Sequence, residues 1–237
     1  MPMEQDVRPF EKFFPGNHLI LGDVGTGKTK LVWSILKDKE YIKEDSINIV
    51  LTDSDKRMWD ESFPTPVTVK NCYATDISWA TNPSDPGIYY CACDYAPRII
   101  TFLECLATWA VQNQNKFEHK VRVFIDISSR TWALPEFSEQ ITRLNYISSS
   151  QDEDFPIEIW AVLGSLNRLT NQTKSIFAGN NLILMNPLPS SLIDELKSIV
   201  GPECRTLIHR LDNIPDRKKQ GYYYAPCNCE EFYFHSF

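Results

Sequence analysis

The chain has 237 residues, of which 43% are hydrophobic and 23% are charged, and its formal net charge is −7. This length and balance suit one α/β domain, with or without a small appendage, and exclude an intrinsically disordered chain. The acidic balance argues against a protein that coats nucleic acid over its whole surface, but it leaves room for a local basic patch.

The sequence carries no signal for a membrane or for secretion. It has no run of 18 apolar residues, and the charged N-terminus lacks the apolar core of a signal peptide. We therefore expect an intracellular protein with no membrane insertion. Seven scattered cysteines, an odd number, disfavour a disulfide framework.

Two Cys-x-Cys pairs raise the question of a zinc site. Cys91 with Cys93 and Cys227 with Cys229 could together offer four thiolates to the metal. Neither pair has the two-residue spacing usual in structural zinc sites, and each lies in a strand-like segment. Buried or half-buried thiols are the alternative interpretation.

The first informative stretch covers residues 17–36 and follows an irregular arm over residues 1–16. A short apolar run predicts a strand, a glycine-rich loop follows, and an amphipathic pattern predicts a helix. The loop matches G-x-x-x-x-G-K-[ST], in which backbone amides wrap a diphosphate. Lys28 would reach the β- and γ-phosphates, and the Thr29 hydroxyl would complete the shell of Mg²⁺. The alternative is a glycine-rich turn that binds nothing. The predicted nucleotide-binding residues are Gly22, Asp23, Val24, Gly25, Thr26, Gly27, Lys28, Thr29 and Lys30.

A second strand is predicted over residues 47–52, with Asp53, Asp55 and Lys56 at its carboxyl end. Ligands bind at this end of the strands in open α/β sheets, so Asp53 and Lys56 are site neighbours or, equally well, part of a solvated turn. Farther along, short strands are predicted over 67–69 and 88–91, and helical spacing follows from Pro97 to residue 111.

The next informative element is an apolar strand over residues 121–126 that ends in Asp126. Its place after the glycine-rich loop is typical of a Walker B strand, whose carboxylate holds Mg²⁺ through the metal's water shell. The residue after it is Ile127, where an acid that activates water is often found. That role stays unassigned, because none of the nearest polar residues is at the expected position: Ser128, Ser129, Glu136 and Glu139.

A third apolar strand is predicted over residues 157–163, after a helix over 135–147. Ser165 and Asn167 follow its end and are candidate sensors of the γ-phosphate; alternatively, Asn167 caps the following segment. The predicted catalytic residues are thus Lys28, Asp126 and Asn167. The remaining predicted elements are a strand over 182–185, helices over 191–200 and 203–211, a basic turn over 217–219, and strands over 222–224 and 232–234.

With these elements in order, the chain resembles the FtsK/HerA superfamily of DNA-pumping motors, especially the genome-packaging ATPases of DNA viruses. The resemblance covers residues 17–186, and only the loop motif is individually specific. An arginine that crosses between subunits in that family has no counterpart near Phe177. Four stretches carry the resemblance: residues 18–29, the turn over 53–56, the strand ending at Asp126 with the helix and strand after it, and residues 175–184.

The resemblance implies an α/β fold of the P-loop NTPase class, with a central, mostly parallel sheet flanked by helices and an additional strand. The strand before Gly164 would lie between the strands that end at Gly22 and Asp126. ATP and Mg²⁺ would be the cofactors, in a single ATPase domain over residues 17–237. A cation supplied in trans would have to come from Lys174, Arg168, Arg143 or Arg130.

The resemblance also implies a partner and a location. The expected protein is a homo-oligomeric ring, a hexamer or a pentamer, that translocates double-stranded DNA in the host cytoplasm or the virion, with viral capsid proteins as candidate partners. Two alternatives remain. One is another P-loop ATPase, such as a helicase loader or an AAA-type remodeller; the other is a nucleotide-binding switch with little turnover. A GTPase is disfavoured because the chain has no N-K-x-D motif.

Overall fold

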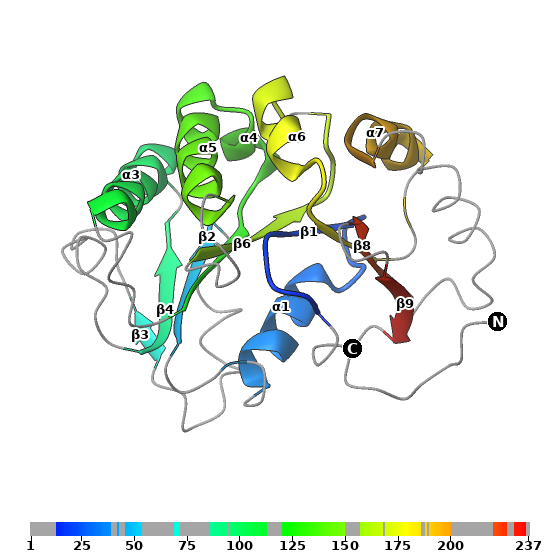
Figure 1. Ribbon diagram of the computed structural model, residues 1–237, viewed down its shortest axis with the longest axis horizontal. Helices are drawn as coiled ribbons and strands as arrows, with labels where there is room; N and C mark the ends of the chain where they lie inside the picture. The colour runs from blue at the N-terminus through cyan, green and yellow to red at the C-terminus, as the bar shows by residue number, and fades with distance from the viewer. Residues whose placement is uncertain are drawn as a thin grey trace.

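The computed structural model describes residues 13–38, 42, 46–53, 69–71, 86–93, 95–112, 120–149, 157–167, 169–185, 188, 190–200, 220–226 and 230–235. Its strands are β1 (His18–Gly22), β2 (Ile47–Thr52), β3 (Val69–Asn71), β4 (Gly87–Ala92), β5 (Val121–Asp126), β6 (Ile157–Leu163), β7 (Asn181–Met185), β8 (Gln220–Ala225) and β9 (Glu230–His235). Within the described residues these nine strands form one sheet (Figure 1). The strand order in this sheet is β3-β4-β2-β5-β6-β1-β7-β8-β9.

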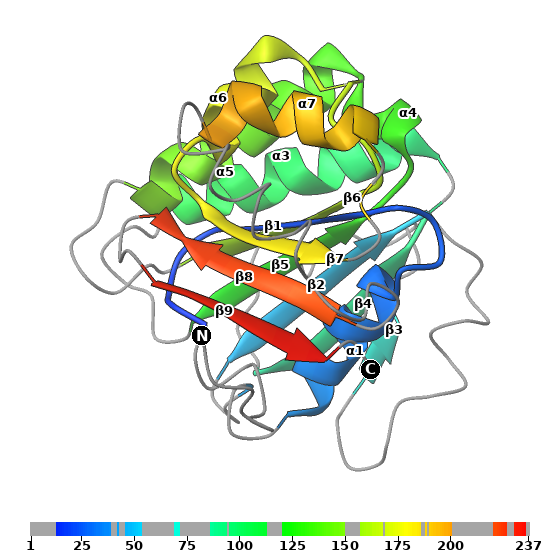
Figure 2. The same cartoon turned by 90° about the vertical axis from the view of Figure 1, so that its right-hand side faces the viewer.

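Most of the sheet is parallel. From β3 to β7 every neighbouring pair runs in the same direction, whereas β8 and β9 extend the sheet as antiparallel strands (Figure 2). Every residue of β1, β2, β6 and β7 is buried. These strands are mostly apolar rather than alternating between apolar and polar residues, as is typical of parallel strands that are covered on both faces.

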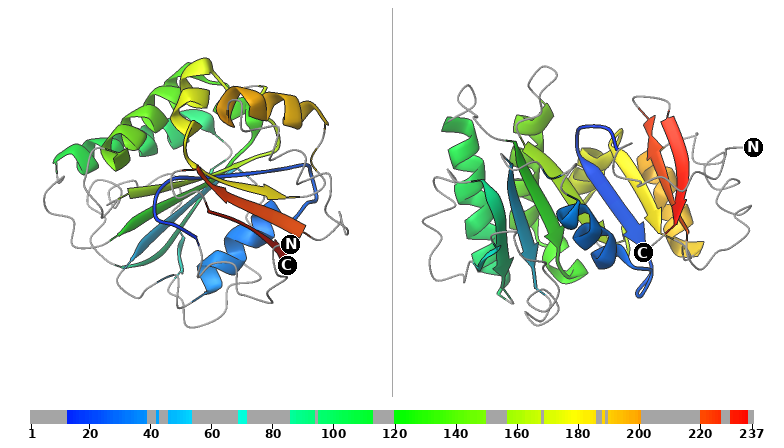
Figure 3. Two further views of the ribbon diagram at one scale, coloured as in Figure 1. Left: turned by 45° about the vertical axis from the view of Figure 1, so that its right-hand side comes forward. Right: turned by 90° about the horizontal axis from the view of Figure 1, so that it is seen from below.

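Helices cover the two faces unequally. The helices are α1 (Lys28–Lys37), α3 (Ala96–Gln112), α4 (Ser129–Trp132), α5 (Pro135–Ser149), α6 (Asn171–Phe177) and α7 (Ser190–Val200). Figure 3 shows α3, α5, α6 and α7 on one side of the sheet and α1 on the other. Side chains alternate accordingly along β1: Leu19 and Leu21 belong to the core beneath the four helices, while Ile20 packs in the core with Leu31 and Ile35 of α1.

The strand order confirms the prediction that the strand before Gly164 lies between the strands that end at Gly22 and Asp126. β6 lies between β5 and β1, so the ends at Gly22, Leu163 and Asp126 follow one another along one edge of the sheet. β2 pairs with the far side of β5, in a register that places Thr52 beside Asp126. Four carboxyl ends of parallel strands therefore meet where ligands bind in open α/β folds.

Several predicted boundaries need correction. The strand expected over 67–69 is β3, Val69–Asn71, and the short helices α4 and α6 were not predicted. The helix expected over 203–211, the basic turn over 217–219, and Asp55, Lys56 and most of the N-terminal arm lie outside the described residues. The division into an arm and a single domain stays a prediction. Phe13, at the end of that arm, is buried and stacks on Tyr223 with ring centroids 4.7 Å apart.

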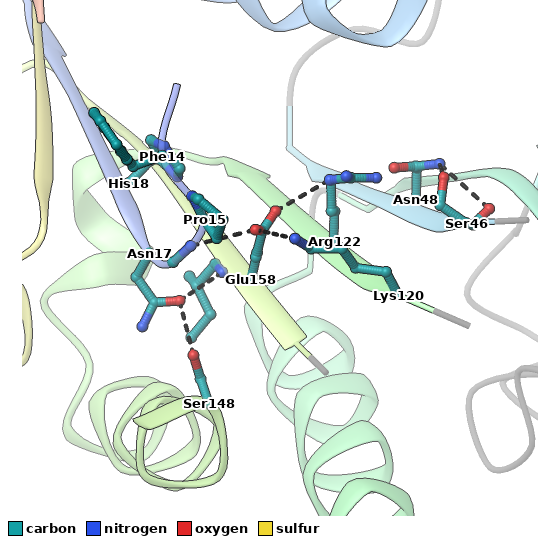
Figure 4. A network of polar contacts seen from close by, with 12 residues as sticks. Phe14, Pro15, Asn17, His18, Ser46, Asn48, Lys120, Arg122, Ser148 and Glu158 are labelled. Atoms are coloured by element: carbon teal, nitrogen blue, oxygen red, sulfur yellow. Dashed lines mark hydrogen bonds and ion pairs between the residues drawn. The ribbon is translucent and has the colours of Figure 1, made fainter. Parts of the chain in front are cut away.

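A buried polar network lies at the opposite edge of the sheet, where β5 and β6 begin (Figure 4). Glu158 is fully buried, and its carboxylate pairs with the Lys120 ammonium at 2.5 Å and with Arg122 Nε at 3.1 Å. It also accepts a hydrogen bond from the Gly16 amide at 3.3 Å. The side-chain oxygen of Asn17 accepts from the amide of Ile159 at 2.8 Å, so this network holds the chain at the start of β1.

None of the helices in the described part of the chain has the length and apolar character needed to cross a membrane.

Candidate nucleotide-binding site

The glycine-rich loop connects the end of β1 to the start of α1. Gly25 and Gly27 have φ angles of 80° and 93°, in the left-handed region that residues with a Cβ rarely adopt. Gly27 is the N-cap of α1, and no side chain caps this end of the helix. The first amides of α1 therefore have no intrahelical acceptor, and the positive end of the helix dipole favours an anion there.

Close packing explains the glycine at the end of β1. A Cβ at Gly22 would lie 2.6 Å from Thr26 Oγ1 and 2.8 Å from the Met185 carbonyl oxygen of β7. Beyond Gly22 the loop turns outward: Thr26 Oγ1 donates to the Asp23 carbonyl at 2.9 Å, and Val24 is 93% exposed at the tip. The loop is thus anchored to β7 at its base and open to solvent at its tip.

Lys28 is held inside the loop. Its ammonium donates to the carbonyl oxygens of Gly22 and Asp23, at 2.8 Å and 2.7 Å. Burial lowers the pKa of Lys28, and the nearby carboxylates of Asp126 and Asp23 oppose that effect. The ammonium is therefore already at the place where the loop would close around a phosphate. Lys30, the last of the predicted loop residues, is exposed.

Thr29 and Asp126 meet across the sheet edge. Thr29 Oγ1, in the first turn of α1, donates to Asp126 Oδ2, at the end of β5, over 2.7 Å. The two residues are 97 positions apart in the sequence, so only the fold brings them together. A hydroxyl and a carboxylate are hard oxygen donors of the kind Mg²⁺ prefers, and this pair would hold the ion beside the loop.

The environment of Asp126 fits a cation. Burial raises the pKa of this carboxyl group, and nearby Asp53 acts in the same direction, whereas the Thr29 hydrogen bond and the Lys28 charge lower it. A half-buried carboxylate with a second acid nearby is stabilised by a divalent ion, because the ion compensates both the lost hydration and the repulsion.

Asp53 belongs to the site. It directly follows β2, and its Oδ2 accepts a hydrogen bond from the Ser128 amide at 2.7 Å, two residues beyond Asp126. The sequence left open whether Asp53 is a site neighbour or part of a solvated turn. The structure brings it to the segment that follows β5.

The segment after β6 lies next to the loop, but the role of Asn167 stays a prediction. A Cβ at Gly164 would lie 3.8 Å from the Gly22 carbonyl oxygen, so the tips of β6 and β1 are neighbours. Ser165 Oγ accepts a hydrogen bond from the Asn167 amide at 3.2 Å. The Asn167 side chain is exposed, and in the described part of the chain it forms no hydrogen bond with Lys28 or Asp126.

This segment is anchored by contacts that were not predicted from the sequence. Glu195 of α7 accepts a hydrogen bond from the Leu166 amide at 2.6 Å. The Thr170 hydroxyl caps α6 by accepting a hydrogen bond from the Thr173 amide. The hydroxyls of Thr170 and Thr173 are also hydrogen-bonded to the Ser138 hydroxyl of α5, at 2.8 Å and 2.5 Å. Threonine is a preferred N-cap residue, so Thr170 is a signal that could have predicted the start of α6. No comparable signal marks Glu195.

The remaining sequence candidates are dispersed. Glu136 and Glu139 are exposed on α5, and Arg130 is exposed on α4. Arg143 donates to Gln140 within α5. Lys174 lies in α6, whereas Arg168, Cys227 and Cys229 are outside the described residues. Among the residues that are described, no group of three metal-binding side chains occurs.

The comparisons with known proteins concern the fold. No protein-family model matches the chain, and no curated protein matches it by sequence. The genome-packaging NTPase B204 from Sulfolobus turreted icosahedral virus 2, in complex with AMPPCP, has a TM-score of 0.62 to this chain at 9% identity. That match covers 94% of this chain and 98% of B204.

A second solved structure gives the same result. The DNA-packaging ATPase B204 from Sulfolobus turreted icosahedral virus matches with a TM-score of 0.59 at 10% identity, over 94% of this chain and 98% of that one. At such low identities the likeness establishes architecture alone. The chain therefore shares the fold of this genome-packaging NTPase, which confirms the P-loop NTPase fold class predicted from the sequence.

Proposed function

We propose that the protein is a Mg²⁺-dependent ATPase. The observation that carries this proposal is the 2.7 Å contact between Thr29 Oγ1 and Asp126 Oδ2, next to a loop whose lysine points its ammonium at the loop carbonyls. A glycine-rich turn without function needs neither a half-buried acid nor a hydroxyl facing it. Oxygen donors, an ammonium and an uncapped helix end together form the set required for a nucleoside triphosphate.

In the proposed hydrolysis, different residues bind the phosphates and the metal ion. The loop amides and Lys28 bind and orient the phosphates, while Thr29 and Asp126 hold the metal ion. Bound Mg²⁺ would neutralise negative charge on the phosphate oxygens during transfer. Catalysis would come mainly from positioning water in line with the bond to the leaving diphosphate, assisted by a cation from a neighbouring subunit.

We further propose that ATP hydrolysis drives translocation of double-stranded DNA by a ring of subunits during genome packaging. The support is the likeness to B204, described as a genome-packaging NTPase, over nearly the whole of both chains. A ring also suits a net charge of −7, because a few basic residues repeated around a pore can grip DNA phosphates while the exterior stays acidic. The proposal places the protein in the host cytoplasm or the virion.

The test is the ATPase rate with and without double-stranded DNA, together with the molecular mass from light scattering in the presence of ATP. A DNA motor should hydrolyse faster with DNA, form a pentamer or hexamer, and lose activity on Lys28→Ala. Stimulation by a protein partner alone would favour a helicase loader, and tight nucleotide binding without turnover would favour a switch. Either outcome would contradict the translocase.

A further inference from the structure

The structure offers a candidate for the residue that activates the attacking water, because the residue after Asp126 is not an acid. Ile127 follows Asp126 and is 7% exposed, within the core beneath α3, α5, α6 and α7. An aliphatic side chain in that core cannot activate water. Any carboxylate that does so must come from another element.

In-line attack restricts where that carboxylate can lie. The leaving diphosphate would occupy the loop between β1 and α1, so the attacking water must approach the γ-phosphate from the opposite side. Moving away from β1 along the sheet, the next strand ends are those of β6, β5 and β2. Among the residues that the structure describes, the acids at these ends are Asp126, whose Oδ2 already accepts from Thr29, and Asp53.

Asp53 is held firmly at this position. Thr52, the residue before it, pairs with Asp126 of β5 on one side, and its carbonyl accepts from the Cys93 amide on the other at 2.8 Å. The carboxylate accepts from the Ser128 amide, and the Ser128 carbonyl in turn accepts from the Thr131 amide at 3.0 Å. Such anchoring on strand ends provides the rigidity that a reacting group requires.

One oxygen of this carboxylate remains available. The bond to Ser128 uses Oδ2, and within the described residues Oδ1 accepts no hydrogen bond. The Asp53 carboxylate also lies close enough to Asp126 for its negative charge to raise the pKa of Asp126. Glu136 and Glu139 are exposed on α5 and carry no comparable anchoring contact in the described part of the chain.

We infer that Asp53 is the catalytic residue that orients and activates the attacking water, an inference that rests on the ATPase activity proposed above. Asp53 accepts a hydrogen bond from the water while the water oxygen bonds to the γ-phosphorus. The bond from that phosphorus to the bridging oxygen breaks, which releases ADP. The proton of the water passes to the Asp53 carboxylate and from there to the released phosphate.

The test compares turnover with nucleotide binding in Asp53→Asn, which keeps an oxygen for the Ser128 amide but removes the base. We expect kcat to fall about 10²- to 10⁴-fold, the usual contribution of a general base. The affinity for a fluorescent non-hydrolysable ATP analogue with Mg²⁺ should fall far less than kcat, by no more than about tenfold, and the same limit should hold for Asp53→Ser. Asp194→Asn, the same chemical change on the exposed part of α7, should leave kcat unchanged.

The possible results separate this inference from the proposed function. A wild-type protein that does not hydrolyse ATP would overturn both. Wild-type turnover that is lost in Lys28→Ala but kept in Asp53→Asn would overturn this inference alone. So would a matching loss of nucleotide affinity in Asp53→Asn, which would make Asp53 a structural residue. A large fall in kcat for Glu136→Gln or Glu139→Gln, with none for Asp53→Asn, would move the role to α5.

Discussion

Mild acid should destabilise the protein through His18. The imidazole is fully buried and lies flat on the Trp160 indole, with ring centroids 3.6 Å apart and an interplanar angle of 7°. Its Nε2 lies 3.4 Å from Asn181 Nδ2. Burial lowers the pKa of His18 to about 3, and the positive charges of Lys120 and Arg122 act in the same direction.

The magnitude follows from the difference between the folded and unfolded states. In the unfolded chain a histidine takes up its proton near pH 6.5, whereas His18 in the folded protein stays neutral down to about pH 3. The unfolded state therefore binds more protons in this window, and stability that is complete above pH 6.5 is lost as the pH falls toward 3. The free energy of unfolding falls by about 1.36 kcal/mol for each pH unit below about 6.5, so His18 lowers it by roughly 2 kcal/mol between pH 7 and pH 5.

Urea denaturation at pH 7 and pH 5, followed by tryptophan fluorescence, measures this loss. His18→Phe keeps an aromatic ring on Trp160 and removes the titrating group, so its unfolding free energy should fall about 2 kcal/mol less over the same window. Phe124→Leu disturbs the same aromatic cluster, since Phe124 also stacks on Trp160, and it should retain the wild-type pH dependence. Equal losses in wild type and His18→Phe would refute a neutral, buried imidazole.

Two further substitutions test the loop and the opposite edge of the sheet. Gly22→Ala places a Cβ 2.8 Å from the Met185 carbonyl oxygen and should weaken binding of an ATP analogue at least about tenfold. In Gly164→Ala the nearest atom to the new Cβ is 3.8 Å away, so the affinity for the analogue should change less than about threefold. Similar effects of the two substitutions would contradict the packing argument. Glu158→Gln leaves Lys120 and Arg122 without their buried countercharge, and it should lower the free energy of unfolding, measured in urea, by about 3 to 5 kcal/mol. The control Glu104→Gln, at an exposed position, should lower it by at most about 0.5 kcal/mol. Equal losses in the two variants would show that the network does not stabilise the fold.

Much of the site could be predicted because its signals are local. Glycines at fixed spacing before Lys28 and Thr29 indicate the loop, since their backbone geometry demands them. Unbroken apolar runs indicate buried parallel strands, and such strands place their carboxyl ends on one edge. The meeting of Thr29 with Asp126 follows from these two facts together.

The contacts that could not be predicted depend on strand order and on chain segments far apart in sequence. Asp53 reaches Ser128 over 75 residues because β2 pairs with β5, a neighbour that no local pattern specifies. Glu195 reaches Leu166 because the fold brings α7 to the segment that follows β6. The helices α4 and α6 have four and seven residues, too few for an apolar periodicity to emerge.

The most direct measurement is calorimetric titration of the protein with a non-hydrolysable ATP analogue, with Mg²⁺ and with EDTA. The wild type should bind one analogue per chain, more tightly with Mg²⁺. Lys28→Ala should weaken binding at least about tenfold in both conditions, whereas Asp126→Asn should lose only the Mg²⁺-dependent part. Failure of the wild type to bind, or equal affinities for all three proteins with Mg²⁺, would contradict a nucleotide site formed by the loop and Asp126.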